Sequence, residues 1–329
     1  MLTDNFKRKI DYLRVSVTDR CDLRCTYCMA EDITFLPKQE VLSIEEIIYL
    51  VDIFNELGVK KFRLTGGEPL VRKNIITLIE HLNILKNNEK ISEHTLTTNG
   101  TNLSKYASLL RENGIKRINV SLDSLNHEKY KEITKHGNLD KVIEGIKASL
   151  KEGIKVKINT VITQNFNDEE VFEIINWCRK NKCDISLIEV MPIGSIGEKR
   201  FEQYLSMKNF EEKLISKLKL TPSTYKTNGP SRYFTDNKTE TKIGIISAIS
   251  HNFCDTCNRV RLTCTGKLYM CLGQNDFVDL KYALRNLSKI DIIRQIEYAM
   301  SIKPQKHNFE IVGDNYDGYI DRYMNETGG

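Results

Sequence analysis

The sequence is organised around Cys21-Asp22-Leu23-Arg24-Cys25-Thr26-Tyr27-Cys28, where three cysteines follow the spacing C-x3-C-x2-C. Four thiolates would complete a tetrahedral zinc site or fully ligate a [4Fe–4S] cube. Three thiolates leave one iron of a cube open to another ligand. The spacing alone therefore favours a metal centre with an open position. It leaves two alternatives, a zinc loop with a fourth ligand elsewhere and three buried free cysteines.

The composition of the 329-residue chain is that of an ordinary globular protein, with 40% hydrophobic and 28% charged residues. No run of about eighteen apolar residues occurs, so we expect no membrane span. The polar segment Met1–Ile10 carries no apolar signal core, so we expect a cytoplasmic protein. Nine cysteines in such a chain indicate metal or catalytic use and not a disulfide framework. The net charge of +5 suits an anionic small molecule and is too weak to indicate nucleic acid.

Short β-branched runs alternate with amphipathic helical stretches from residue 12 to about residue 190. Such alternation predicts β/α units and a parallel sheet. A complete eight-unit barrel usually needs about 250 residues, so this length fits an incomplete (β/α)6 barrel that is open on one side. A doubly wound sheet is the alternative that periodicity leaves open. The six strands are expected at residues 12–17, 60–65, 95–98, 117–122, 155–162 and 185–190.

Distinctive polar or glycine-rich residues follow the ends of five of the predicted strands. After the cysteine loop come Gly66-Gly67-Glu68-Pro69, Thr97-Thr98-Asn99-Gly100, Ser121-Leu122-Asp123 and Met191-Pro192. Functional groups of parallel α/β proteins gather at the carboxyl ends of the strands. We therefore expect these segments to surround one site. Neither a G-x-G-x-x-G motif nor a P-loop is present, so a nicotinamide or Walker-type site is not indicated.

The alternation stops after Pro192, and we place a domain boundary between residues 193 and 194. The second part, residues 194–329, contains a second set of three cysteines with the spacing C-x2-C-x13-C, namely Cys254, Cys257 and Cys271. A second metal site is therefore expected. A structural zinc ribbon with Cys264 as the fourth ligand is the alternative.

Two arginines follow the second cysteine set at alternate positions of an extended segment, Arg259 and Arg261. Alternate residues of a strand point the same way. Two guanidinium groups on one face suit a bidentate grip on phosphate, and a solvated edge is the alternative. Cys178 and Cys183 are expected to be buried free thiols. A Gly-Gly end is typical of a frayed terminus.

Taken together, these motifs resemble those of radical S-adenosylmethionine (SAM) enzymes and, more closely, the GTP 3′,8-cyclase family of molybdenum cofactor biosynthesis. The cysteine loop and Gly66–Pro69 match the superfamily. The narrower family is matched by residues 13–21, 96–100, 119–123 and 254–263, by Cys271, and by the terminal Gly328-Gly329.

The resemblance implies an incomplete (β/α)6 TIM-like barrel, closed by a C-terminal α+β iron–sulfur cluster domain and commonly found in a homodimer. One [4Fe–4S] cluster, the one that binds SAM, would be held by Cys21, Cys25 and Cys28. A second [4Fe–4S] cluster would be held by Cys254, Cys257 and Cys271. The residues implied for the SAM site are Tyr27, Gly67, Ser121 and Met191.

The resemblance also implies a reaction. A 5′-deoxyadenosyl radical would abstract H3′ of GTP, giving (8S)-3′,8-cyclo-7,8-dihydroguanosine 5′-triphosphate. Arg14 with Gly328 and Gly329 would assist ring closure or the reduction that follows. The residues implied for GTP binding are Arg14, Lys61, Arg63, Thr97, Lys157, Arg259, Val260 and Arg261. The implied partners are an external electron donor and cyclic pyranopterin monophosphate synthase as the downstream enzyme, with no nucleic acid and no membrane.

One position departs from the family pattern. The family usually carries Arg-Phe-Ile-Glu on the sixth strand, where this chain has Ser186-Leu187-Ile188-Glu189. An arginine directed at the triphosphate is therefore missing at Ser186, and Lys182, Lys199 and Arg200 are candidates for its replacement by proximity in sequence. We expect the substitution Ser186→Arg to lower the apparent KM for GTP.

Two other functions compete with the cyclase. Another radical SAM enzyme with two clusters, such as a peptide-modifying maturase, would share both cysteine sets. Such maturases usually carry a longer and more cysteine-rich C-terminal domain. A zinc-binding nucleic-acid or scaffold protein is disfavoured by the weak net charge and by the β/α pattern.

Overall fold

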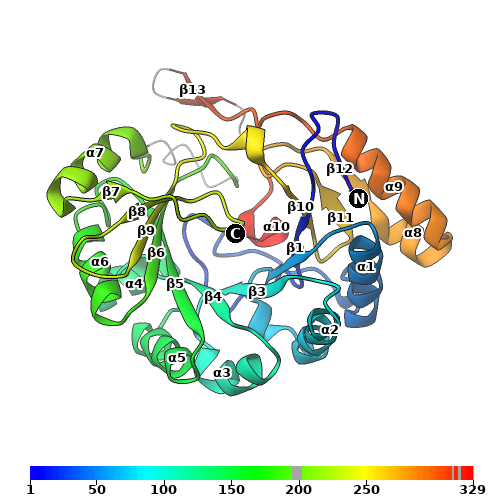
Figure 1. Cartoon of the computed structure of the whole chain (residues 1–329), viewed down its shortest axis with the longest axis horizontal. Helices are drawn as coiled ribbons and strands as arrows, with labels where there is room; N and C mark the ends of the chain where they lie inside the picture. Colours follow the sequence, from blue (N-terminus) through cyan, green and yellow to red (C-terminus); the bar gives the residue numbers. More distant parts are fainter. Residues whose placement is uncertain (195–201, 313–314, 318–319, 329) are drawn as a thin grey trace.

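A 12-stranded sheet forms the centre of the computed structural model, which describes residues 1–194, 202–312, 315–317 and 320–328. Six of its strands follow one another along the chain, each parallel to the next. The sheet curves around a central space, and the helices that connect the parallel strands lie outside it (Figure 1). The six strands are Tyr12–Ser16 (β1), Lys61–Thr65 (β2), Glu93–Thr98 (β3), Arg117–Ser121 (β4), Lys155–Ile162 (β5) and Asp184–Glu189 (β6).

The predicted partial barrel is therefore confirmed, with strand bounds within two residues of the expected ones. The first helix begins as its sequence indicates. Ser43 Oγ accepts the N–H of Glu46, and the Glu46 carboxylate accepts the N–H of Ser43, which is a capping box. The covering helices are Ile44–Glu56 (α1), Ile75–Asn87 (α2), Leu103–Glu112 (α3), His127–Thr134 (α4), Leu139–Lys151 (α5) and Val171–Lys180 (α6).

The later part of the chain extends this sheet at both edges. Lys242–Ile246 (β9) pairs in parallel with β6, and Arg259–Leu262 (β10) pairs in parallel with β1. Antiparallel strands continue the sheet beyond each of them. The strand order is β12-β11-β10-β1-β2-β3-β4-β5-β6-β9-β8-β7, so β12 and β7 are its edges. The outer strands are Thr221–Pro222 (β7), Arg232–Thr235 (β8), Lys267–Tyr269 (β11) and Phe277–Asp279 (β12).

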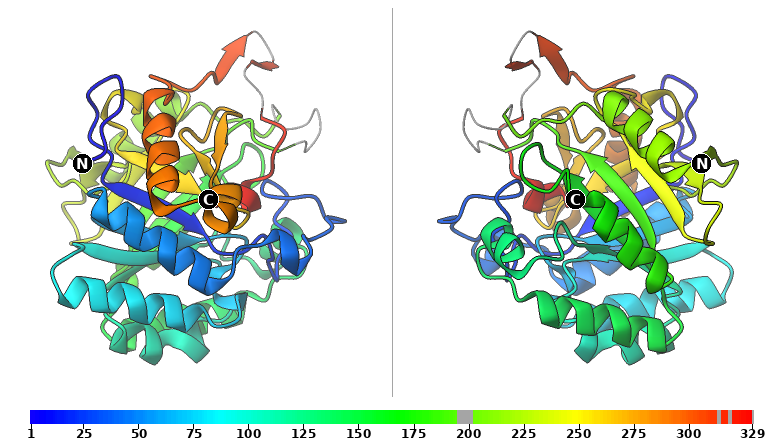
Figure 2. Two further views of the ribbon diagram at one scale, coloured as in Figure 1. Left: turned by 90° about the vertical axis from the view of Figure 1, so that its right-hand side faces the viewer. Right: turned by 90° about the vertical axis from the view of Figure 1, so that its left-hand side faces the viewer.

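The C-terminal end of the described chain lies inside the ring of strands. The short helix Met324–Thr327 (α10) contacts β1 and is seen near the centre of Figure 1. A second sheet of two strands projects from the body in both views of Figure 2. The remaining elements are Met207–Leu218 (α7), Leu280–Asn286 (α8), Lys289–Ser301 (α9), Glu310–Val312 (β13) and Asn315–Asp317 (β14), with short 3-10 turns at Lys38–Glu40, Pro69–Val71 and Cys254–Thr256.

Alternation along the strands separates the hydrophobic core from the central space. On β1, Leu13 and Val15 are fully buried in the core, whereas Tyr12 and Arg14 face the interior of the barrel. Successive side chains of a strand point to opposite faces, so this period of two directs polar side chains inward. Within the described ranges, no helix is both long enough and apolar enough to cross a membrane.

Candidate active site

Both cysteine sets face one cavity of about 290 Å³ inside the barrel. Its wall is built from the inner faces of the parallel strands, the cysteine loop, Phe253, Cys254 and Cys257, residues 270–273, and Met324 of α10. Cys264 does not line the cavity and is buried elsewhere, as are Cys178 and Cys183. The cysteines on the wall are Cys21, Cys25, Cys28, Cys254, Cys257 and Cys271.

The N-terminal cysteine loop is held near its middle and at its C-terminal end by backbone hydrogen bonds. Arg24 N–H donates to the carbonyl of Thr134 at 2.9 Å, and Met324 N–H donates to the carbonyl of Cys28 at 3.1 Å. Cys21 Sγ accepts the N–H of Leu23 at 3.4 Å. The loop is thus fixed between the end of α4 and the C-terminal helix α10, which no local pattern in the sequence indicates.

Acidic side chains surround the N-terminal cysteines. Tyr27 Oη donates to Asp123 Oδ2 at 2.7 Å, and Val161 N–H donates to Asp123 Oδ1 at 2.8 Å. Burial raises the pKa of Asp123 to about 6. Burial raises the pKa of Cys25 as well, and the nearby cysteines and carboxylates, Asp123 among them, raise it further. A thiolate here therefore requires compensation from a bound positive centre.

The glycine turn after β2 packs against the strand-to-loop junction that carries the cysteines. Gly67 N–H donates to the carbonyl of Thr18, and Glu68 N–H donates to the carbonyl of Arg20, both at 2.8 Å. A Cβ on Gly67 would lie 2.2 Å from the Arg20 carbonyl oxygen. The turn therefore approaches the chain's own backbone closely, and Gly67 also lines the cavity.

The Glu68 carboxylate joins this turn to the end of β3. It accepts the N–H of Leu70 at 3.0 Å, the Thr98 hydroxyl at 2.8 Å and the N–H of Asn99 at 2.6 Å. The Asn99 amide in turn donates to Asp22 Oδ1 at 2.6 Å. Burial raises the pKa of Glu68 to about 7 despite these donors. The residue organises two of the predicted strand ends around the cysteine loop.

Basic side chains surround the C-terminal cysteines. Lys303 Nζ lies 3.9 Å from Cys257 Sγ, and Arg8 Nη1 donates to the carbonyl of Cys254 at 2.7 Å. Burial acts to raise the pKa of Cys257, but the Lys303 ammonium and the Arg259 guanidinium outweigh it, so this pKa is lowered. The second triad therefore sits among cations, in contrast to the first.

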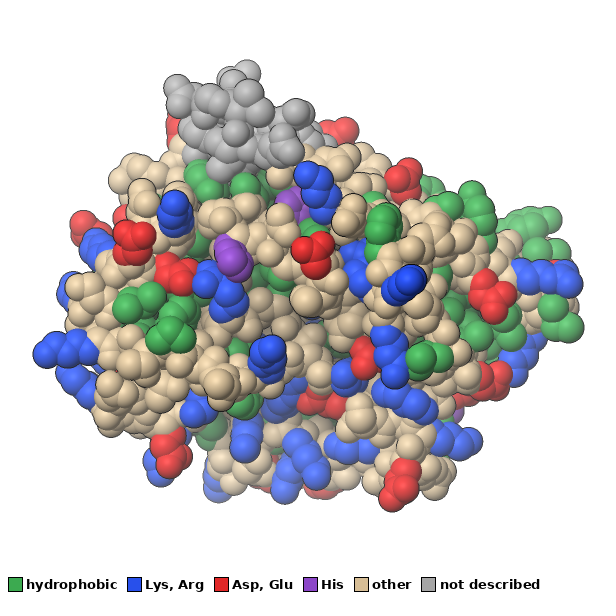
Figure 3. All heavy atoms as spheres, turned by 45° about the horizontal axis from the view of Figure 1, so that its top comes forward, with side chains coloured by type: hydrophobic (Ala, Val, Ile, Leu, Met, Phe, Trp, Pro, Cys, Tyr) green, Lys and Arg blue, Asp and Glu red, His purple; other side chains and the backbone are tan. Residues whose placement is uncertain are grey.

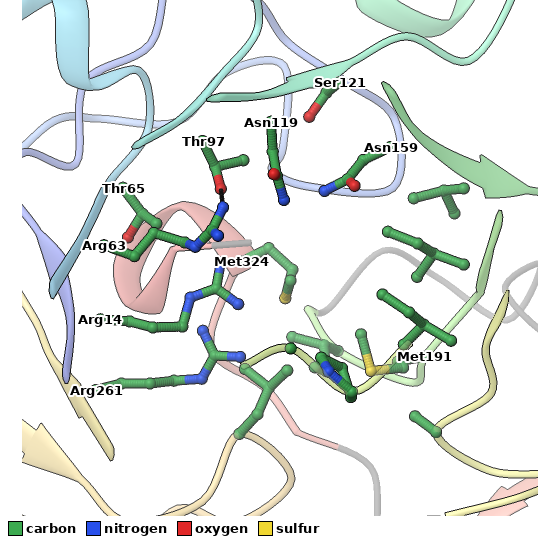
Figure 4. Close-up of a pocket in the computed structure, with 18 of the residues that line it drawn as sticks. Arg14, Arg63, Thr65, Thr97, Asn119, Ser121, Asn159, Met191, Arg261 and Met324 are labelled. Atoms are coloured by element: carbon green, nitrogen blue, oxygen red, sulfur yellow. Dashed lines mark hydrogen bonds between the residues drawn. The ribbon is translucent and has the colours of Figure 1, made fainter. Parts of the chain in front are cut away.

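Three arginines lie side by side across the floor of the cavity. Arg14 on β1 is in register with Arg63 on β2 and with Arg261 on β10, and Figure 4 shows the three side chains reaching into the same space. Burial lowers the pKa of Arg14, and the neighbouring Arg261 lowers it further. Burial lowers the pKa of Arg261 to about 10, with Arg259 adding to the effect. Such a concentration of buried positive charge favours a polyanion.

The C-terminal tail is attached to this arginine row. Arg261 Nη1 donates to the carbonyl of Gly328 at 2.6 Å. Gly328 has a φ of +72°, and a Cβ there would lie 2.0 Å from Thr65 Oγ1. Only glycine fits this left-handed position. Gly328 is buried and not frayed, and Gly329 lies outside the described residues.

Asparagines that the sequence analysis did not single out as site residues line the opposite wall. Asn119 and Asn159 face the cavity with Ser121 (Figure 4). The Oδ1 atoms of both asparagines are buried and have no hydrogen-bond partner among the described residues. Unsatisfied buried acceptors indicate a polar ligand. Alternation within the strands could have found these residues, because Asn119 precedes Ser121 by two and Asn159 follows Lys157 by two.

Most of the expected site residues line this cavity. Among the described residues, Lys61, Val260 and Gly328 do not, and Gly328 is joined to the cavity wall through its hydrogen bond from Arg261. Lys61 Nζ pairs with Asp11 Oδ2 at 2.8 Å and does not line the cavity. The Val260 side chain is buried in the hydrophobic core. The expected residues on the wall, besides the cysteines, are Arg14, Tyr27, Arg63, Gly67, Thr97, Ser121, Lys157, Met191, Arg259 and Arg261.

Ser186 stands where the family usually carries an arginine on the sixth strand, and the structure encloses this position. Ser186 on β6 is fully buried, and its Oγ lies 3.0 Å from Ser231 Oγ. Lys157 Nζ donates to Tyr233 Oη at 3.2 Å nearby. Among the candidates named for a replacement, Lys199 and Arg200 lie outside the described residues. Lys182 is not on the cavity wall.

The donors on the cavity wall fit iron–sulfur clusters. Each triad offers only thiols, the ligand that iron–sulfur clusters use. No three Cys, His, Asp or Glu residues within the described ranges are grouped as ligands of a single metal ion. A single zinc ion holds all its thiolates about 2.3 Å away, whereas a cube binds each cysteine to a different iron.

Comparisons with known proteins agree with this geometry. Residues 15–178 match a family model described as Radical SAM superfamily, and residues 183–309 match one described as Molybdenum Cofactor Synthesis C. The fold is similar to that of Streptococcus suis SuiB bound to S-adenosylmethionine, with a TM-score of 0.63 over 88% of this chain and 68% of that chain. Identity to SuiB is 16%, so this likeness shows the fold alone. Fold and site together define a protein of the radical SAM class.

Relatives with higher sequence identity show which family within the radical SAM class the chain belongs to. The proteins named GTP 3′,8-cyclase from Brucella ovis and from Brucella suis biovar 1 are each 50% identical over 329 residues, which is 100% of this chain and 96% of theirs. The chain belongs to the GTP 3′,8-cyclase family.

Proposed function

We propose that this chain is a radical SAM lyase that converts GTP to (8S)-3′,8-cyclo-7,8-dihydroguanosine 5′-triphosphate in molybdenum cofactor biosynthesis. The observation that carries the proposal is the single cavity with an open cysteine triad at each side and an arginine row in its wall. One triad suits the origin of a radical, and the other, with the arginines, suits a nucleotide. Full-length relatives named for this reaction support the assignment.

Two [4Fe–4S] clusters and SAM are the cofactors in this proposal. Cys21, Cys25 and Cys28 would hold the cluster that, with SAM, would supply the radical for removal of hydrogen from C3′ of the ribose. Tyr27, Gly67, Ser121 and Met191 line the cavity where SAM would bind. Enclosure by the barrel wall and α10 excludes water from the reacting atoms.

Arg14, Arg63 and Arg261 would hold the triphosphate, because buried guanidinium groups bind phosphate oxygens in pairs. Arg259, Lys157 and Thr97 line the same wall and would contribute to GTP binding. Lys61 and Val260 remain predicted GTP contacts from the resemblance to the family, although neither residue lines the cavity. Arg14, Gly328 and Gly329 are retained as residues that assist ring closure.

The division of the chain at residues 193 and 194 is part of the proposal, with SAM chemistry assigned to residues 1–193 and the nucleotide-binding cluster to residues 194–329. We also propose an external electron donor, cyclic pyranopterin monophosphate synthase as the downstream enzyme, and a cytoplasmic location.

A homodimer is proposed from the surface of α8 and α9. Tyr282 on α8 is 63% exposed, and Ile290 on α9 is 62% exposed. Hydrophobic side chains gather on that side of the molecule, at the right of Figure 3. Sedimentation equilibrium of the anaerobic protein tests this assembly.

The reaction is tested by incubating anaerobic protein with SAM, dithionite and GTP, and following 5′-deoxyadenosine and the cyclised nucleotide by mass spectrometry. We expect both products in equal amounts, and neither without SAM. GTP deuterated at C3′ should transfer its label to 5′-deoxyadenosine.

The competing assignments give different outcomes in this experiment. A peptide-modifying maturase would form 5′-deoxyadenosine without consuming GTP. A zinc protein would contain stoichiometric zinc instead of about eight irons and their acid-labile sulfides per chain, the content of two cubes.

A further inference from the structure

Lys303 occupies an unusual place for a lysine. Its side chain follows α9 and is buried, with 3% of the residue exposed. Nζ donates to the carbonyl of Met270 at 2.5 Å and to the carbonyl of Arg259 at 3.2 Å, and it lies 3.9 Å from Cys257 Sγ. Burying an ammonium is costly unless hydrogen bonds and a negative partner compensate it. Two carbonyls and one sulfur supply that compensation.

The Lys303 ammonium acts on the whole C-terminal triad. Its electrostatic interactions reach Cys254, Cys257 and Cys271. Cys271 directly follows Met270, whose carbonyl Lys303 binds, and Arg259 lies two residues after Cys257. One buried cation therefore contacts Cys257 and interacts electrostatically with Cys254 and Cys271.

The segment that carries Lys303 is held in place from the N-terminus of the chain. Arg8 donates from Nη1 to the carbonyl of Gln305 at 2.7 Å and from Nη2 to the carbonyl of Pro304 at 2.6 Å. Arg8 is itself fixed by a buried ion pair with Asp4 at 2.6 Å. The ammonium is therefore a preorganised charge and not a mobile surface group.

We propose that Lys303 is a positioning residue for the C-terminal cluster, whose reduction potential it raises above that of the N-terminal cluster. A reduced cluster carries one more negative charge than the oxidised cluster, so a fixed cation nearby stabilises the reduced form. In a buried site this effect is strong, because little solvent screens it. Net charge and hydrogen bonds to the sulfurs are the terms that set such potentials.

This inference rests on the proposed second cluster, and it goes beyond the proposed reaction by assigning a role to Lys303. A purely structural role is the competing explanation, because the same side chain joins β10 to the segment before Cys271. The two roles are separated by substitutions that keep or remove the charge.

The experiment uses the anaerobic full-length protein with both clusters, and the variants Lys303→Met, Lys303→Gln and Lys303→Arg. Gln is neutral but keeps a donor for the carbonyls, and Arg keeps the charge. Lys306→Met is the matched control, since Lys306 is an exposed cation three residues further along. Iron and sulfide are counted, and each cluster is titrated potentiometrically by electron paramagnetic resonance, with SAM added to shift the N-terminal signal.

We expect Met and Gln to lower the ratio of reduced to oxidised C-terminal cluster about tenfold or more at a fixed potential, equal to about 59 mV for one electron. The reduction potential of the N-terminal cluster should stay near the wild-type value in every variant. In Lys303→Arg and Lys306→Met, the potential of the C-terminal cluster should also stay near wild type. If Met and Gln lose the C-terminal cluster while Arg retains it, the charge serves to hold the cluster and not to set its potential, which would count against the proposal.

An unchanged potential in Met or Gln at full iron content would overturn the proposal, as would loss of the cluster in Arg together with Met and Gln. Failure of the proposed function would look different. Wild-type protein would then contain iron for one cube only, and no second signal would appear in any variant.

Discussion

The two cysteine triads face one cavity but lie among side chains of opposite charge. Around Cys21, Cys25 and Cys28 the chain places Asp22, Glu68 and Asp123. Around Cys254, Cys257 and Cys271 it places Arg8, Arg259 and Lys303. Both triads offer three thiols and leave one position of a cube open.

This difference shows how one ligand set can serve two tasks. Negative neighbours oppose the addition of an electron, so a cluster held by the first triad would be the stronger reductant once reduced. Positive neighbours favour the reduced form and attract an anionic nucleotide. The arginine row that includes Arg14 and Arg261 lies between the two, where a substrate would contact both sides.

Removal of one cysteine from each triad should give the largest effects and should separate the two tasks. Cys25→Ser should lose about half of the iron and abolish SAM cleavage. Cys257→Ser should lose a similar share of iron but still form 5′-deoxyadenosine, without cyclising GTP. Iron analysis and product assays check both.

Cys264→Ser is the control for this pair, because Cys264 is buried outside the cavity. It should keep all iron and activity. Equal loss of SAM cleavage in Cys25→Ser and Cys257→Ser would show that the triads do not have separate tasks.

Gly328→Ala tests whether the docked tail completes the side of the cavity formed by Arg261. The left-handed backbone costs about 1–2 kcal/mol for a residue with a Cβ, and the clash with Thr65 adds to it. We expect cyclisation to fall at least about tenfold, since that factor corresponds to about 1.4 kcal/mol, while iron content and SAM cleavage persist. Deletion of Gly328-Gly329 should abolish cyclisation.

The matched control for this substitution is Gly153→Ala. Gly153 has nearly the same φ, +73°, but a Cβ there meets nothing within 4 Å. This variant places a Cβ at a matching positive φ far from the tail, so it should cyclise GTP normally. Full activity in Gly328→Ala would mean that the tail is not needed in this position.

Glu68→Gln tests the raised pKa of this carboxyl group beside the first triad, through the pH dependence of the free energy of unfolding. The folded pKa of Glu68, about 7, lies above its ordinary value of 4.5. Its contribution to stability is therefore complete below pH 4.5 and is lost as pH rises through 7. Gln does not titrate, so between pH 4 and 8 the stability of the variant should improve relative to wild type by on the order of 3 kcal/mol.

Denaturant unfolding of the two proteins at several pH values measures this difference. Asp291→Asn is a suitable control, because that exposed carboxylate caps α9 far from the cavity. A difference between wild type and Glu68→Gln that does not vary with pH would contradict the raised pKa.

Ser186→Arg should give the smallest effect of these substitutions, because the structure leaves little space for an arginine side chain at this position. Ser186 is fully buried beside Ser231, so an arginine needs space that Ser231 now fills. The predicted fall in KM for GTP, roughly two- to fivefold for a partly solvated pair, is expected when Ser231→Gly accompanies it. Initial-rate kinetics of both single variants and the double variant provide the test, and an unchanged KM in the double variant would contradict it.

Much of the fold follows from local patterns. The six parallel strands, the capping box at Ser43 and the shared face of Arg259 and Arg261 each depend on residues within a few positions of one another. The stretch over residues 221–242 is polar and rich in turn-forming residues, so its local pattern does not indicate β7 and β8, which lie within it. These strands have two and four residues and form only by pairing, β8 with β9 and β7 with β8.

By itself, the sequence determined the count and spacing of the thiols and the alternation that turns polar side chains into the barrel, since both are properties of neighbouring residues. Only the tertiary structure decided which charges surround each triad. Lys303 approaches Cys257 from 46 positions away, and Arg8 approaches Cys254 from 246. Contacts over such separations exist only after the sheet has brought both ends of the chain to one cavity, and no local pattern can encode them.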